Sequence, residues 1–169
     1  AQPRTLRTMD VSASARAGTS ALQEALTGDA NALVVAAERR LAKPGSVEEI
    51  SYGDAAVAIR TGRTAGIAEF IGSVSSATDF VDHYRSSGAS FDYGFEARWV
   101  RDEGQLPELP QLLPDLMRAH AVSSSDVRWL AMNAPKRVRQ KLAKELSLES
   151  INHDMTFEAH VGQCGSAEP

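Results

Sequence analysis

The sequence of 169 residues has a single cysteine, Cys164, few aromatic residues and no long apolar run. One cysteine cannot form an internal disulfide, which is compatible with a reducing compartment. No apolar run reaches the roughly 18 residues that a membrane span requires, and no charged-then-apolar signal segment opens the chain. We therefore expect a cytoplasmic protein without a membrane anchor.

The chain also lacks an excess of positive charge and the motifs of common cofactor sites. Its net charge of -4 argues against nucleic acid or an anionic membrane as the main partner. No glycine motif of the dinucleotide-binding or P-loop type is present. The four histidines are not spaced as a zinc site requires, so we expect no metal. These histidines are His83, His120, His153 and His160.

The hydrophobic content of the chain is sufficient for a buried core, since 43% of the residues are hydrophobic. Residues 31–38 form a near-continuous apolar run, which is typical of a strand covered on both faces in a parallel or mixed sheet. Residues 55–60 predict a second strand after the Gly53-Asp54 step, and residues 67–74 predict a third. These patterns favour an α/β fold.

The most informative stretch is a bend from an extended run into a helix of small residues. Residues 5–11 predict a strand, and residues 17–26 predict a helix that ends at Gly28. Free N–H groups and the positive end of the helix dipole would lie at residues 15–18, where they could stabilise a thiolate or a developing oxyanion. The residue at the bend is Ala15, which can neither attack a carbonyl nor be acylated.

The second half of the chain predicts two further helices. Residues 107–120 carry leucines at helical spacing, and Pro114 within them predicts a kink or two short helices. Residues 127–132 predict a short strand, and Ala134-Pro135 opens the next helix. The apolar stripe of that helix is Val138, Leu142 and Leu146. One charged stretch with a tryptophan has two interpretations, the lining of a ligand channel or a charged strand. Its residues are Arg98, Trp99, Arg101 and Asp102.

Residues 15–22 resemble the nucleophile segment of the thiolase superfamily, in particular of hydroxymethylglutaryl-CoA synthase and ketoacyl-ACP synthase III. The pattern in these enzymes is Cys, any residue, Gly or Ala, Gly, then a small residue and Leu. In this match Ala15 occupies the position of the catalytic cysteine. A second and more specific block is similar to the central segment of the synthase. It comprises residues 67–70, 79–85, 91–93 and 96–104.

The resemblance implies two further catalytic positions. Residues 129–148 are similar to the segment that carries a catalytic histidine, and here Met132 stands at that position with Asn133 beside it. Residues 157–169 resemble the glycine-Asn loop that completes the active site, with Gln163 at the Asn position. Together with the alanine at the bend, all three catalytic positions are changed, so we expect the chain itself to be inactive.

An acyl-CoA or acyl-carrier thioester is the substrate that the resemblance implies, with no other cofactor. The residues expected to contact it are Ser14, Arg16, Gly18, Thr19, Asn133, Gly162 and Cys164. The basic residues of the helix that follows Pro135 predict either a solvated face or a contact with the phosphates of coenzyme A. Cys164 could act as a substitute nucleophile beside His160, or it could be buried and inert.

The resemblance implies a thiolase-like layered α-β-α-β-α fold, of which this chain would cover the middle portion. Residues 1–62 would form the end of the first half, with the nucleophile turn, its helix and the following strands. Residues 63–169 would begin the second half. A longer polypeptide or a second chain would supply the remainder, including the catalytic glutamate of the synthase.

Two functions from different classes follow from these expectations. The first is an acyl-CoA condensing or acyl-transferring enzyme, in which a cysteine takes the acyl group and a histidine polarises the second thioester. Ala15 would then replace the cysteine through engineering or divergence. The second is a non-catalytic subunit that pairs with a homologous thiolase-like chain, in a homo- or hetero-dimer, and with a small OB-fold, zinc-ribbon protein. The loss of three catalytic positions favours an inactive copy.

Overall fold

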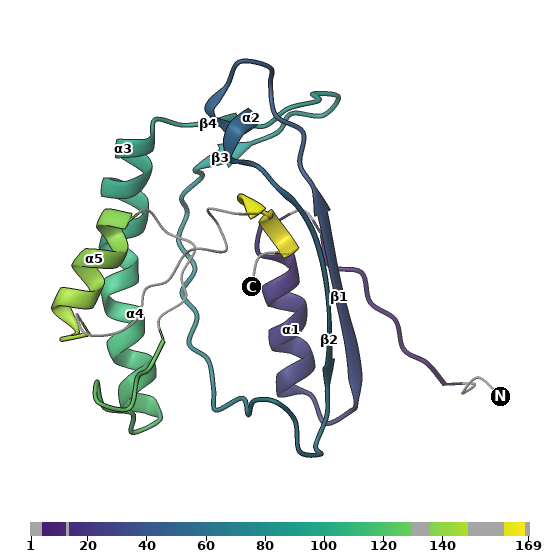
Figure 1. The fold of residues 1–169 in the computed structure, drawn as a ribbon, viewed down its shortest axis with the longest axis vertical. Helices are drawn as coiled ribbons and strands as arrows, with labels where there is room; N and C mark the ends of the chain where they lie inside the picture. The colour runs from purple at the N-terminus through teal and green to yellow at the C-terminus, as the bar shows by residue number, and fades with distance from the viewer. Residues whose placement is uncertain (1–4, 13, 130–135, 149–160, 168–169) are drawn as a thin grey trace. The chain divides into compact units, whose positions relative to one another are not determined.

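The computed structural model describes residues 5–12, 14–129, 136–148 and 161–167. This part of the chain combines helices with two small antiparallel sheets, so the α/β class is confirmed (Figure 1). Its contacts divide into two compact units. Unit 1 comprises residues 1–40, 50–68 and 161–169, and unit 2 comprises residues 41–49 and 69–160.

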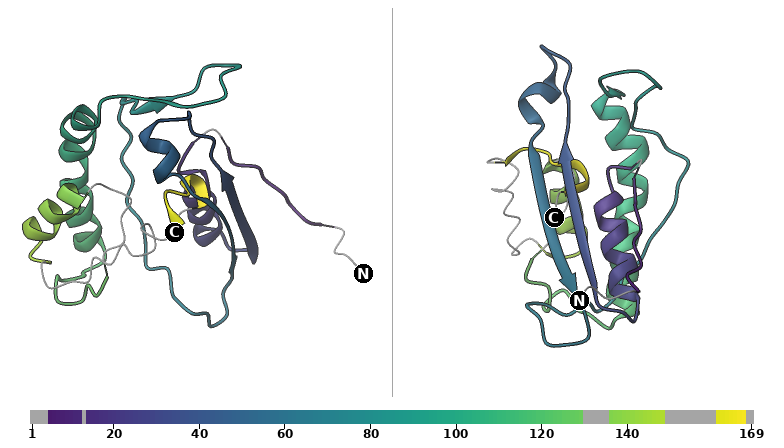
Figure 2. Two further views of the ribbon diagram at one scale, coloured as in Figure 1. Left: turned by 45° about the horizontal axis from the view of Figure 1, so that its top comes forward. Right: turned by 90° about the vertical axis from the view of Figure 1, so that its right-hand side faces the viewer.

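Unit 1 is built on a helix and a two-stranded ribbon. Helix α1 (Ala17–Thr27) packs against strand β1 (Ala32–Arg39), and strand β2 (Asp54–Thr61) runs beside β1 (Figure 2). The helix ends at Gly28, whose N–H donates to the carbonyl of Glu24 at 3.1 Å. The helix predicted at 17–26 and the strands predicted at 31–38 and 55–60 are therefore confirmed.

The sheet of unit 1 differs from the prediction of a parallel or mixed sheet covered on both faces. β1 and β2 pair antiparallel, because the chain returns through the connection that contains the short helix α2 (Val47–Ser51). The half-buried side of β1 contacts α1 and the short helix η2 (Gly165–Ala167). On the other side, Leu33 is 68% exposed and Val35 is 65% exposed. One apolar face of the ribbon is thus uncovered within the described chain.

Two other strand predictions are wrong. Residues 5–11 are exposed and belong to no strand, and residues 67–74 form no strand either. An alternating pattern specifies which side chains would share a face, but a strand exists only where a neighbour supplies hydrogen bonds. Of the strand predicted at 127–132, Val127 and Arg128 lie in no strand, Trp129 makes an isolated β-bridge, and residues 130–132 are outside the described residues.

Unit 2 contains a minimal hairpin and a group of helices. Strands β3 (His83–Tyr84) and β4 (Tyr93–Gly94) pair antiparallel. Helix α3 (Ala97–Trp99) continues through the π-helical segment η1 (Val100–Gln105) into helix α4 (Leu106–Ala119). The charged strand considered for residues 98–102 is therefore helical instead. α4 also stays a single helix through Pro110 and Pro114, rather than dividing into two.

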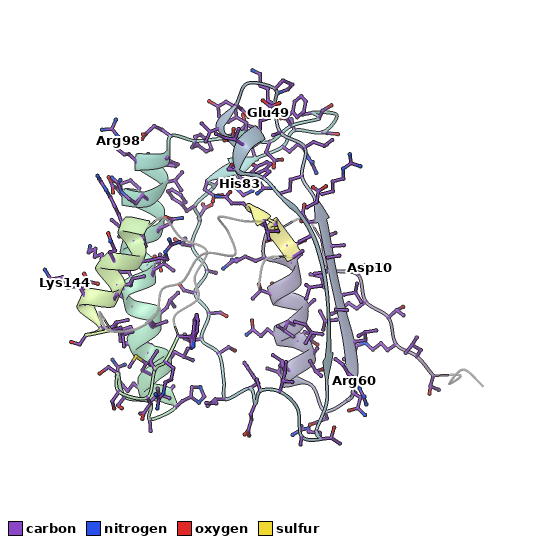
Figure 3. All side chains as sticks on the ribbon, in the orientation of Figure 1. Asp10, Glu49, Arg60, His83, Arg98 and Lys144 are labelled. Atoms are coloured by element: carbon purple, nitrogen blue, oxygen red, sulfur yellow. The ribbon has the colours of Figure 1, made fainter. Side chains whose placement is uncertain are left out.

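The core of unit 2 lies between α4 and helix α5 (Lys136–Glu145). Val138 and Leu142 are fully buried and pack against Leu106 and Leu109. The predicted stripe on this helix therefore faces the core. Opposite the stripe, basic side chains of α5 are exposed, as Figure 3 shows for Lys144. This agrees with a solvated basic face, and contact with coenzyme A stays a prediction.

Candidate functional site

At the bend before α1, Ser14 accepts hydrogen bonds from the first backbone N–H groups of the helix. The Oγ atom of Ser14 accepts a hydrogen bond from the N–H of Arg16 at 3.1 Å, and the Ser14 carbonyl accepts one from the N–H of Ala17 at 3.0 Å. No side chain caps the helix. Ser14, Ala15, Arg16 and Thr19 are all exposed. The first N–H groups of a helix have no intrahelical acceptor, and Ser14 takes up those of Arg16 and Ala17. The N–H groups of Gly18 and Thr19 are therefore the ones at this end of α1 that can hold negative charge.

The turn of residues 162–166, which we call the glycine turn, is fixed by backbone hydrogen bonds. The N–H of Gln163 donates to the carbonyl of Ser51 at 2.7 Å, and the N–H of Gly53 donates to the carbonyl of Gln163 at 3.0 Å. Gly162 has a φ of 81°, a left-handed conformation that glycine adopts without steric cost. Gln163 is thereby bonded to the chain just before β2.

The glycine turn packs directly on the start of α1. The carbonyl oxygen of Ser166 lies so close to Gly18 that a Cβ atom on Gly18 would collide with it. A Cβ there would also stand 3.1 Å from the Cβ of Ala36 on β1. Glycine at position 18 is therefore required by close backbone approach. The structure thus brings the predicted site residue Gly18 against the segment that contains Gly162, Gln163 and Cys164.

A carboxylate on β1 fastens the glycine turn to the sheet. The backbone N–H of Ser166 donates to Oε2 of Glu38 at 3.1 Å, and the Ser166 hydroxyl donates to the same oxygen at 2.5 Å. Glu38 lies on the half-buried side of β1. Sequence reasoning missed both residues. The available signal was a single charged residue at an inward position of an otherwise apolar strand, since such a residue requires a polar partner.

Arg40 and Tyr52 form a second polar contact near the same turn. A guanidinium nitrogen of Arg40 donates to the hydroxyl of Tyr52 at 2.7 Å, and the Cζ atom of Arg40 is 3.6 Å from the centroid of the tyrosine ring. Tyr52 is also the bridge partner of Gln163. The strand end, the chain before β2 and the glycine turn are thereby joined by polar contacts.

Cys164 is the remaining predicted site residue that the structure describes, and it belongs to the glycine turn. Cys164 is fully buried, and its thiol donates to the Gly162 carbonyl at 3.3 Å. Burial of the thiol agrees with an inert cysteine rather than a substitute nucleophile, which must be accessible. Met132, Asn133 and His160 lie outside the described residues, so their roles stay predictions.

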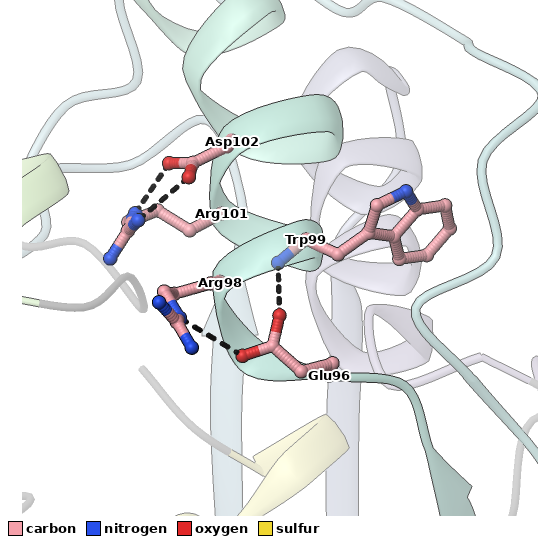
Figure 4. A network of polar contacts seen from close by, with 5 residues as sticks. All are labelled: Glu96, Arg98, Trp99, Arg101 and Asp102. Carbon is pink, nitrogen blue, oxygen red and sulfur yellow. Dashed lines mark hydrogen bonds and ion pairs between the residues drawn. The ribbon is translucent and has the colours of Figure 1, made fainter.

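Ionised side chains at the start of the unit 2 helices form a separate polar network (Figure 4). A carboxylate oxygen of Glu96 accepts the N–H of Trp99 at 2.9 Å, and this hydrogen bond lowers the pKa of Glu96. Arg101 donates twice to Asp102, at 2.6 and 2.7 Å, which lowers the pKa of that carboxyl. Carboxylates that stay ionised in this way suit helix capping and charge pairing rather than proton transfer near neutral pH.

No model of a known protein family matches the chain, and neither does any curated protein. Within the described residues, no group of three or more His, Cys, Asp or Glu side chains could hold a metal ion. None of the helices described here has the length and apolar character needed to cross a membrane. Function is therefore inferred from the residues of the site and their contacts.

Proposed function

We propose that the chain is an inactive relative of acyltransferases of the hydroxymethylglutaryl-CoA synthase type, which condense or transfer acyl groups. The observation that supports this most is the packing of the glycine turn on the start of α1, next to Ala15, which bears no reactive group. Ser166 contacts Gly18 there, and the N-terminus of α1 has no side-chain cap. Ala15 stands one residue before the N-cap residue of that helix, Arg16.

The chemistry of acyl transfer explains which parts would be kept and which lost. A thiolate attacks the carbonyl carbon of a thioester, backbone N–H groups hold the oxyanion that forms, and the thiol of the carrier then leaves. The start of α1 could supply the N–H groups. The methyl group of Ala15 has no electron pair for the attack, and methionine at position 132 cannot exchange a proton. An acyl-CoA or acyl-carrier thioester would then bind without reacting.

The uncovered face of the β1–β2 ribbon favours a second candidate, a non-catalytic subunit. Leu33, Val35 and Ala37 lie exposed on that face, and an apolar face of this kind is expected to be covered in an assembly. A homologous thiolase-like chain, as a homo- or hetero-dimer partner, would supply the cover and complete the layered fold. A small OB-fold, zinc-ribbon protein would join the complex.

Restoring a thiol at the bend tests the first proposal. We expect Ala15→Cys to become labelled when it is incubated with radiolabelled acetyl-CoA, with the label released by hydroxylamine as a thioester requires. Ser14→Cys is the matched control, because it places an exposed thiol one residue away. The new thiol in Ala15→Cys should also have a lower pKa than that in Ser14→Cys, measured from alkylation rates against pH, because it lies closer to the helix N-terminus.

The possible outcomes separate the proposals. Label on the unaltered chain contradicts inactivity, and equal labelling of the two cysteine variants contradicts a preserved acylation site. An Ala15→Cys chain that stays unlabelled and whose new thiol has an ordinary pKa contradicts the proposal that the N-terminus of α1 is a preserved acylation site. For the subunit candidate, the unaltered chain is incubated together with a co-purifying partner. Label on the partner alone supports that candidate.

A further inference from the structure

Unit 2 carries a row of aromatic side chains that the proposed acyl-transfer site does not use. The aromatic row consists of Tyr84, Tyr93, Phe95, Trp99 and Phe80. Three of the rings contact one another, with centroids 5.4 Å apart for Tyr84 and Tyr93, 5.8 Å for Tyr93 and Phe95, and 6.1 Å for Tyr84 and Phe95. The row continues at 5.3 Å to Trp99 and at 4.6 Å to Phe80. Its rings are therefore in continuous contact.

Local backbone structure explains why these rings share one surface. Tyr84 and Tyr93 are paired across β3 and β4, so both side chains stand on the same face. Phe95 follows Tyr93 by two residues and returns to that face, and its N–H extends the pairing through a 3.0 Å bond to the Asp82 carbonyl. The Glu96 cap begins α3 directly afterwards. The Trp99 ring then points away from the side of the helix that bears Arg98 and Arg101 (Figure 4).

The row is exposed to a degree that a core would not allow. Tyr84 is 47% exposed, Tyr93 is 58% exposed, and Phe95 and Trp99 are each 42% exposed. A contiguous exposed apolar patch marks a binding surface. The contacts between the rings also restrict the ligand. A quaternary ammonium group needs space between aromatic faces, and rings at these distances leave none, so the row is a ridge rather than an aromatic cage.

Polar groups along the ridge indicate the chemistry of its ligand. The hydroxyls of Tyr84 and Tyr93 and the indole N–H of Trp99 have no acceptor among the residues that the structure describes. The ridge thus offers aromatic surface together with hydrogen-bond donors. A proline-rich segment in the polyproline II conformation offers the complement, apolar rings and backbone carbonyls without internal hydrogen bonds.

Charges beside the ridge favour a basic flank on that segment. Asp82, Asp92 and Glu96 lie next to the row in sequence, and an oxygen of Glu48 lies 4.0 Å from the position of a Cβ on Gly94. Arg85 lies 3.9 Å from Asp92, Arg98 lies 3.4 Å from Glu96, and the ring of His83 contacts Asp82 at 2.6 Å. The excess of negative charge attracts a Lys or Arg beside the prolines and disfavours nucleic acid.

We propose that the aromatic row binds a proline-rich segment of a partner protein, in the polyproline II conformation and flanked by a basic residue. The aromatic rings supply the apolar contact, and the phenol and indole groups donate to carbonyls of the segment. The carboxylates beside the row select the basic flank. This interaction is independent of acyl transfer, so it holds whether or not the bend before α1 proves to be an acylation site.

The test is a titration of the full chain with an oligoproline peptide that has an arginine at each end. Trp99 fluorescence reports binding in a Trp129→Phe background, where it is the only indole. We expect saturable binding of this peptide. A peptide with glutamate at each end should bind more weakly, and an alanine-glycine peptide with the same arginines should not bind. Raising the salt concentration should reduce the difference in affinity between the arginine-flanked and the glutamate-flanked proline peptides.

Variants then locate the binding surface. Tyr93→Ala should weaken binding by about tenfold, as truncation of an aromatic anchor does. Tyr84→Phe removes a hydroxyl alone and should weaken binding less, with an unchanged far-UV circular dichroism spectrum. The matched control is Phe70→Ala, an exposed phenylalanine outside the row, which should bind as the parent does.

Three results would overturn the proposal. One is the absence of saturable binding by the arginine-flanked oligoproline, and another is equal binding by the alanine-glycine peptide. The third is equal affinity of Tyr93→Ala and Phe70→Ala for the proline peptide. Analytical ultracentrifugation adds a direct check on the occupant. Self-association that Tyr93→Ala abolishes would assign the ridge to a second copy of the chain and contradict a proline-rich partner.

Discussion

The two units of this chain are held together in different ways. Residues that are almost fully buried in unit 1 are small: Ala17, Thr61, Cys164 and Ala167. In unit 2 the corresponding side chains include Val138, Leu142 and Leu148. Small side chains let backbones approach closely, as Ser166 approaches Gly18, and polar contacts then fix the position. Large apolar side chains stabilise mainly through buried area and packing. We therefore expect larger side chains to destabilise unit 1 most, and smaller side chains to destabilise unit 2 most.

The largest expected effect is the removal of volume from unit 2. Leu142→Ala should destabilise this unit by about 2–5 kcal/mol, because a fully buried leucine is replaced by a cavity. Both tryptophans, Trp99 and Trp129, belong to unit 2, so denaturation followed by their fluorescence reports on it. Leu33→Ala, at an exposed position, should change this transition by less than about 0.5 kcal/mol. Similar losses in the two variants would contradict a leucine-based core.

Adding one carbon to unit 1 should have the next largest effect. Gly18→Ala should destabilise the contact between α1 and the glycine turn by about 1–3 kcal/mol, since the new methyl group collides with the Ser166 carbonyl. Unit 1 contains no tryptophan, so fluorescence does not follow its unfolding. Amide hydrogen exchange in α1 measures the loss instead. Gly66→Ala is the control, as a Cβ there meets its nearest atom at an ordinary 3.6 Å. Unchanged exchange in Gly18→Ala would show that the close approach is absent.

Removing the Glu38 carboxylate, which binds the glycine turn, should destabilise unit 1 less than Gly18→Ala does. Glu38→Ala should destabilise the turn by about 1–2 kcal/mol, because two donors of Ser166 lose their acceptor. Glu38→Gln keeps one acceptor oxygen and should have a smaller effect. Faster exchange of the amides at residues 161–167 would report the loss. Glu24→Gln, an exposed change on α1, should leave these amides as they are.

A stabilising change is expected at the end of α4. Ala121 has a φ of 51°, and the N–H of Val122 donates to the carbonyl of Met117 at 2.9 Å, as at a helix end that normally uses glycine. Ala121→Gly should therefore stabilise unit 2 by about 0.5–1 kcal/mol, less than the strain it relieves because glycine also loses more entropy on folding. Thermal unfolding followed by tryptophan fluorescence measures the gain. Ala119→Gly, inside the helix, should destabilise instead.

The smallest expected effect is a loss of stability of unit 2 at acid pH. The bond from the Trp99 N–H lowers the pKa of Glu96, so its stabilising contribution is present above an ordinary glutamate pKa of about 4.3 and is lost as the pH falls through the lowered value. An acid titration of Trp99 fluorescence in a Trp129→Phe background should show this step. Glu96→Gln should abolish it, and Glu103→Gln should retain it. A step that survives in Glu96→Gln would assign the acid response to another carboxyl.

Elements with strong local patterns could be predicted from the sequence. The small-residue helix at 17–26 and the stripe of Val138 and Leu142 were found from spacing, because burying one helical face requires apolar residues at that period. Residues 5–11 and 67–74 carry strand-like patterns but no strand, since pairing depends on a neighbour that a local pattern does not reveal. The antiparallel pairing of β1 and β2 was missed for the same reason.

The candidate site divides in the same manner. The bend at Ala15 was predicted from the local pattern, and the segment of the glycine turn was singled out by an untested resemblance to an enzyme family, each as a separate segment. Their contact through Gly18 and Ser166, and the role of Glu38, depend on residues far apart in the chain. Nothing in the spacing of these residues indicates that they meet, because the contact forms only when the ribbon and α1 have packed.

By itself, the sequence determined helices α1, α4 and α5, their apolar faces and the alanine at position 15, since these depend on residue type and local period. Only the tertiary structure decided that β1 leaves one face open, that the glycine turn rests on the start of α1, and that five aromatic rings form one ridge. The physical reason is that each of these features is a contact between segments separated along the chain. Such a contact depends on how the backbone folds, and a local pattern carries no record of it.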